Sequence, residues 1–90
     1  MAGPFNTKNL TLTGGGTWDR YTLENETNAV LIQARTSVDV KVSEHADGSE
    51  YWTMKADKGV AIGSYNIDNQ KLYFNGTNGV VVEFLYVNRP

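Results

Sequence analysis

The residues that could carry out chemistry are few in this chain, and none of them lies in a pattern typical of a catalytic site. The only histidine, His45, lies in the segment Glu44-His45-Ala46-Asp47, and the chain has no cysteine. A general base or a metal site needs further histidine, cysteine or carboxylate partners at suitable spacing. A solvated loop histidine is the simpler interpretation, and we predict no catalytic residue, no metal ligand and no cofactor.

The aspartates and glycines also favour turns over active sites. Asp47, Asp57 and Asp68 lie in turn sequences, where aspartate often hydrogen-bonds the nearby backbone, and no acidic cluster has the spacing of a calcium loop. The run Gly14-Gly15-Gly16 lacks the Lys-Ser/Thr pair and the helix of a phosphate-binding loop. We therefore expect tight turns at these positions and a protein that is not an enzyme.

Aromatic side chains are the better candidates for a ligand site. Trp18 falls on the same side of an expected strand as Arg20, which indicates an outer face, and Tyr73 points away from the apolar side of its own strand. Exposed rings stack on sugars or anchor protein partners. Trp18 and Tyr73 are thus candidate stacking residues, whereas Trp52 shares a side with Met54 and is expected in the core.

Composition limits the classes of partner. The 90 residues suffice for one domain, and eight basic against ten acidic residues give a net charge of −2. Without a basic stripe, binding to nucleic acid or to a membrane surface is not expected. The chain begins without a signal-peptide pattern, so we expect synthesis in the cytoplasm. A small domain without disulfides often gains stability by oligomerisation.

Short runs of alternating apolar and polar residues, closed by Gly, Asn or Asp turns, fill most of the chain. In residues 37–43 three valines fall on one side and Asp39 and Lys41 on the other, which is the repeat of a half-buried strand. The expected strands are 8–13, 17–23, 29–35, 38–43, 51–55, 60–62, 71–75 and 80–87. We predict an all-β fold, a compact antiparallel β-sandwich or flattened barrel of seven to eight short strands, jelly-roll-like. A flexible N-terminal arm (1–6) would precede a single domain (7–90).

The last expected strand is apolar on both sides. One side carries only large apolar residues, and the other is interrupted only by Glu83. Either the strand lies centrally with both faces covered, or its outer face meets another subunit. The residues that we predict at such an oligomer interface are Val81, Leu85, Val87 and, from the arm, Phe5.

The order of these motifs resembles that of small β-sandwich virion proteins of tailed bacteriophages. The likeness lies in YTLEN (21–25) leading into AVLIQ (29–33) and in VDVKVS (38–43) followed by YWTMK (51–55). It continues in LYF (72–74), the glycine-rich turn at 76–79 and VVVEFLY (80–86). The pattern covers most of residues 8–87, without signature residues.

The resemblance implies a non-enzymatic structural protein of the virion, such as a capsid decoration or accessory protein that oligomerises and binds the particle surface. Its expected partners are sister subunits, with a trimer favoured, and the major capsid protein or another virion protein. It would be made in the host cytoplasm and located in the virion. The alternative is a carbohydrate-binding β-sandwich module.

Overall fold

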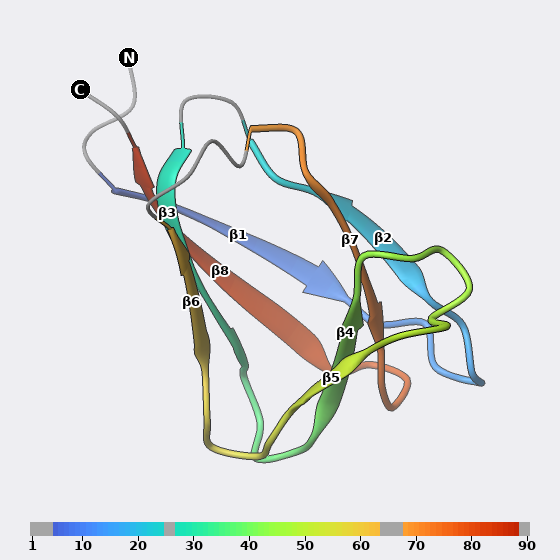
Figure 1. Ribbon diagram of the computed structural model, residues 1–90. Helices are drawn as coiled ribbons and strands as arrows, with labels where there is room; N and C mark the ends of the chain where they lie inside the picture. Colours follow the sequence, from blue (N-terminus) through green and yellow to red (C-terminus); the bar gives the residue numbers. More distant parts are fainter. Residues whose placement is uncertain (1–4, 25–26, 64–67, 89–90) are drawn as a thin grey trace.

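The computed structural model describes residues 5–24, 27–63 and 68–88, which form eight strands in two four-stranded sheets (Figure 1). Sheet A has the order β1 (Phe5–Thr11), β8 (Val81–Asn88), β3 (Thr27–Ala34), β6 (Val60–Gly63). Sheet B has the order β2 (Asp19–Thr22), β7 (Lys71–Asn75), β4 (Val40–Ser43), β5 (Trp52–Met54). All neighbouring strands are antiparallel. The prediction of an antiparallel β-sandwich is confirmed, and the sheets do not close into a barrel.

The strand pairing is that of a jelly roll. β1 pairs with β8, β2 with β7, β3 with β6 and β4 with β5, as in one long hairpin rolled up on itself. β4 and β5 follow each other within sheet B, and every other connection crosses between the sheets. The expected jelly-roll-like arrangement is therefore confirmed, and β3, which is apolar on both sides at residues 29–32, lies inside its sheet between β8 and β6.

Alternation along each strand sends one set of side chains between the sheets. On β8, Val82, Phe84 and Tyr86 are almost completely buried, as their period-two pattern predicts. Removing such a side chain from water contributes about 1.5–3 kcal/mol each. The remaining members of the core come from both sheets and their flanking turns: Leu12, Leu23, Val30, Ile32, Val40, Met54, Leu72, Phe74 and Val80.

An aromatic cluster joins the two sheets at the centre of this core. The Phe84 ring stacks on Tyr21, with centroids 3.9 Å apart and planes 7° apart. It also meets the ring of Phe74 edge to face, at 5.5 Å and 83°. Next to it, the Tyr86 hydroxyl donates a hydrogen bond of 2.8 Å to the Tyr21 hydroxyl. Since Phe84 and Tyr86 belong to sheet A and the other two rings to sheet B, these contacts fix how the sheets face each other.

The structure bears on three further expectations, which concern the N-terminal arm, the outer face of β8 and the position of Trp52. Phe5 and Asn6 of the expected arm belong to β1 and pair with Val87 and Tyr86, while residues 1–4 lie outside the described residues. β8 is central in its sheet, but no described element covers its outer face. The prediction that Trp52 lies in the core is wrong, because β5 is an edge strand of sheet B and leaves this side chain 54% exposed.

The tyrosine pair gives a test of the aromatic cluster by pH. Burial raises the pKa of Tyr21 and Tyr86 above the ordinary value of 10.0, and the hydrogen bond donated by Tyr86 raises its pKa further. The unfolded chain therefore releases these protons first as the pH rises. The contribution of this pair to the free energy of unfolding should be constant below pH 10.0 and should decrease as the pH rises above that value.

Tyr86→Phe should lower the free energy of unfolding at neutral pH by about 1 kcal/mol and reduce the loss at alkaline pH. Urea unfolding of the variant and the wild type at neutral and at alkaline pH measures both changes. Tyr73→Phe is the control, because among the described residues the Tyr73 hydroxyl has no hydrogen-bond partner. Equal effects of the two substitutions would contradict a stabilising role of the buried hydroxyl pair.

Candidate functional site

The outer face of sheet A carries an apolar surface that the strand registers assemble. Outward-facing residues of neighbouring strands are register partners and so lie in rows across the sheet. Two rows are apolar apart from one threonine, and the third is polar. The rows are Phe5–Val87–Ala29, Thr7–Leu85–Leu31–Ala61 and Asn9–Glu83–Gln33.

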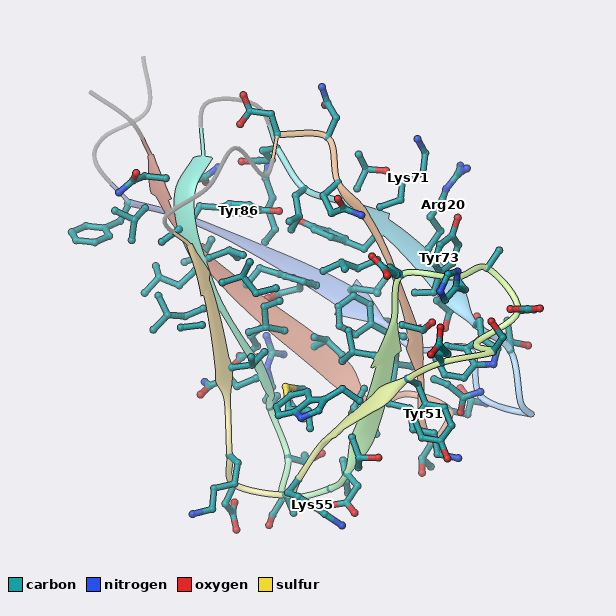
Figure 2. All side chains as sticks on the ribbon, viewed as in Figure 1. Arg20, Tyr51, Lys55, Lys71, Tyr73 and Tyr86 are labelled. Carbon is teal, nitrogen blue, oxygen red and sulfur yellow. The ribbon has the colours of Figure 1, made fainter. Side chains whose placement is uncertain are left out.

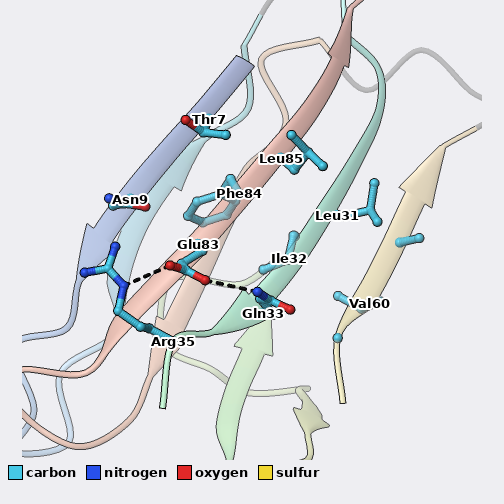
Figure 3. A pocket seen from close by; sticks show the side chains of 12 residues that line it. Thr7, Asn9, Leu31, Ile32, Gln33, Arg35, Val60, Glu83, Phe84 and Leu85 are labelled. Carbon is cyan, nitrogen blue, oxygen red and sulfur yellow. Dashed lines mark hydrogen bonds and ion pairs between the residues drawn. The ribbon is translucent and has the colours of Figure 1, made fainter. Parts of the chain in front are cut away.

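Large apolar side chains on this face are open to solvent. Phe5 is 61% exposed, Leu31 46% and Leu85 36%. The face is also hollowed, with a volume of about 680 Å³ between the side chains of β1, β8, β3 and β6 (Figure 3). A contiguous exposed apolar patch on a small domain marks an interaction site. We call this surface the apolar face, defined by the three rows above.

One end of the hollow is polar but electrically neutral. Glu83 accepts hydrogen bonds from Arg35 Nε at 2.8 Å and from Gln33 Nε2 at 3.0 Å (Figure 3). These donors hold the pKa of the Glu83 carboxyl below its ordinary value. Arg35 and Glu83 are the charged residues among those lining the hollow, and their charges cancel.

The structure places three of the four residues predicted at an oligomer interface, Phe5, Leu85 and Val87, on the apolar face, and Val81 beyond its polar row. Phe5 and Val87 are direct register partners, and Val81 and Leu85 lie on the same outward side of β8. The sequence interpretation missed Leu31, which supplies the opposite wall of the hollow from β3. Its signal was present, since residues 29–32 are apolar on both sides of the strand.

The outer face of sheet B has a different chemistry. Its outward strand positions hold no aliphatic side chain. They are Arg20, Thr22, Lys41, Ser43, Thr53, Lys71, Tyr73 and Asn75. Tyr73, one of the two predicted stacking residues, is half-buried here beside its register partner Arg20.

Trp18, the other predicted stacking residue, is half-buried under the loop of residues 44–50. A Cβ atom added at Gly48 would overlap the indole ring, so this glycine lies directly against it. The Tyr51 ring lies 6.0 Å from Trp18 between centroids, and Lys41 Nζ lies 4.8 Å from the Tyr51 centroid. Trp18 and Tyr51 thus form a small cluster that the loop partly covers.

Hydrogen bonds hold the loop in this position. Gly48 N–H donates to the His45 carbonyl at 3.0 Å, and Ser49 N–H donates to Asp47 Oδ1 at 2.9 Å. The bonds from Ser49 lower the pKa of Asp47. Gly48 has a φ of +70°, which explains why the turn needs glycine at this position.

His45 lies exposed in the same loop, with Nε2 at 3.9 Å from Glu44 Oε1 and 3.7 Å from Glu50 Oε1. Among residues 5–24, 27–63 and 68–88, no group of three or more His, Cys, Asp or Glu side chains is placed to hold a metal ion. In the same described ranges, no helix has the length and apolar character needed to cross a membrane.

Comparison with models of known protein families, with curated proteins and with solved structures gave no match for this chain. The outer faces of the two sheets are therefore the features from which a function can be inferred.

Gly48→Ala tests the contact between the loop and Trp18. The added methyl group must displace the indole ring, so we expect the free energy of unfolding to fall by about 1–3 kcal/mol. The emission of Trp18 should move to longer wavelength, measured in a Trp52→Phe background. Gly15→Ala is the matched control, because Gly15 also has a positive φ, +63°, but no atom within 4 Å of an added Cβ. An equally large decrease in the free energy of unfolding for Gly15→Ala would show that backbone strain, and not the contact with the Trp18 ring, causes the effect.

Proposed function

We propose that this protein is a non-enzymatic structural protein of a tailed-bacteriophage virion, a capsid decoration or accessory protein whose copies associate through the apolar face and bind the particle surface. The observation that carries the proposal is the hollowed apolar face itself, which exposes Phe5, Leu31 and Leu85 together. The order of strand motifs, which resembles that of phage virion proteins, supports the location in the virion.

The area of the apolar face suits a contact between copies of the chain. Four strands about 4.8 Å apart, each of about seven residues at ~3.3 Å, present roughly 450 Å². Covering this face with an equal surface of a neighbour buries about 900 Å² of accessible surface in total on the two partners. Side chains that project from the sheet add to this area. A specific interface needs about 1,000 Å².

Charge also favours a second copy as the occupant of this face. Because Arg35 and Glu83 neutralise each other, this face does not repel a second copy although the whole chain carries a charge of −2. The edge of the face supplies a protruding group, since Phe5 lies on edge strand β1 outside the residues that line the hollow. An edge that meets a neighbour's face makes a heterologous contact, and such contacts form a closed ring when the rotation between neighbouring subunits closes. The proposed assembly is a trimer of this kind.

Leu31→Asp and Leu85→Asp test the assembly. Each places a charge in the centre of the apolar face, and we expect it to weaken self-association by roughly tenfold or more. Light scattering after size-exclusion chromatography, over a range of concentrations, measures the effect. Trp52→Asp is the control, because Trp52 is as exposed as these leucines but belongs to sheet B. A wild-type chain that stays monomeric at every concentration would overturn self-association through this face.

The virion location has its own test. Particles purified from a culture of the phage that carries the gene should contain this protein by mass spectrometry. Particles from a deletion strain should lack it and should bind the purified protein when it is added back. Absence from the purified wild-type particles would contradict the proposed location, whatever the oligomeric state.

A further inference from the structure

A second candidate surface lies on the opposite outer side of the sandwich, on β2 and β7. The register pairs Arg20 with Tyr73 and Thr22 with Lys71, so these four side chains form two adjacent rows. Figure 2 shows Arg20, Lys71 and Tyr73 next to one another on this side of the molecule. We call these four residues the cationic strip.

Among the described residues, the two cations of the strip have no carboxylate partner, and the same is true of Lys41 on β4 of the same sheet and of Lys58. Lys8, Arg35 and Lys55 form ion pairs with carboxylates. In the described part of the chain, no carboxylate lies within ion-pair distance of Arg20 or Lys71. The outward strand positions of sheet B also contain no Asp or Glu.

The two cations lie close enough for one anionic ligand to meet both, and such a ligand removes the weak repulsion between them. Arg20 and Lys71 lie at diagonal positions of neighbouring strands, within reach of each other's charge. Rows two residues apart along a strand are separated by about 6.8 Å, so two anionic groups of one ligand can each meet a cation. On a chain with a net charge of −2, this local excess of positive charge indicates an anionic ligand.

The other two side chains indicate what kind of anion fits. Tyr73 offers part of a ring for stacking on the apolar face of a sugar, and Thr22 offers a hydroxyl group for hydrogen bonds. The strip has a single half-buried ring and no aliphatic side chain, which is little apolar surface for the core of a protein interface. Two cations are too few for the phosphate contacts of a nucleic-acid site.

We propose that the cationic strip binds an acidic polysaccharide, with Arg20 and Lys71 pairing with sugar carboxylates and Tyr73 stacking on a sugar ring between them. Arginine forms two parallel hydrogen bonds with a carboxylate, and lysine supplies a point charge. The site is separate from the apolar face and does not depend on self-association or on a virion location.

The test is a titration of isotope-labelled protein with an oligogalacturonate, followed by NMR. We expect chemical-shift changes at Arg20, Lys71 and Tyr73 and none at Leu31 or Leu85. The double variant Arg20→Gln/Lys71→Gln should raise the dissociation constant by roughly tenfold or more. The matched control, Lys55→Gln/Lys58→Gln, removes the same charge elsewhere and should bind as the wild type does.

Two further measurements separate the alternatives. Tyr73→Ala should weaken binding and Tyr73→Phe should retain it, because stacking requires the ring and not the hydroxyl group. A neutral malto-oligosaccharide, a polyglutamate peptide and a single-stranded oligonucleotide serve as competing probes. Equal or tighter binding of any of them, or an equal loss in the control variant, would overturn the proposal. The Leu85→Asp variant, which we expect to be monomeric, should still bind the oligogalacturonate. Polysaccharide binding is therefore tested independently of self-association.

Discussion

The packing of Phe84 between Tyr21 and Phe74 is the contact on which the rest of the structure depends. It joins β8 of sheet A to β2 and β7 of sheet B, and the hydroxyl pair of Tyr86 and Tyr21 lies beside it. Once Phe84 points inward, alternation forces its neighbours along β8 outward. A shift of one residue would exchange the two sides of the strand. The same buried ring that holds the sheets together thereby determines which side chains form the apolar face.

The two outer faces suit different kinds of contact. The apolar face is hollowed and neutral, with Leu31 and Leu85 at its centre, which favours another copy of the chain. The outer face of sheet B is polar, and Arg20 and Lys71, which have no carboxylate partner among the described residues, lie next to each other on β2 and β7. A sandwich of only two layers can present both surfaces at once because each sheet has one side free. Under the two proposals, the molecule meets its sister subunits on one side and a soluble or surface-bound polymer on the other.

Local alternation was sufficient to place a strand near each of the eight observed ones, although β1 begins at Phe5, before its expected start. Alternation could not predict how deeply a side chain is buried. Trp52 lies on the inward side of β5, but its side chain is exposed because β5 lies at the edge of its sheet. The hollow could not be predicted from the sequence either, because it requires β1, β8, β3 and β6 to lie in that order. No local sequence pattern specifies the order of strands in a sheet. The same holds for Arg20 and Lys71, which are neighbours only because β2 pairs with β7. Leu85, by contrast, could be placed on an outer face from the sequence, because an apolar side chain on the second side of a strand is itself a local signal.

The pairing of Phe5 with Val87 places the first and last described strands of the chain side by side at one corner of sheet A (Figure 1). A short linker could therefore join Phe5 to Val87, and the chain could be opened in a turn elsewhere, without changing the sandwich. Under the proposed assembly, a fluorescent protein or an affinity tag joined directly to Phe5 or Val87 would crowd the sister subunit at that corner. The same cargo carried on the turn at 76–79 of a rearranged chain would leave that corner free.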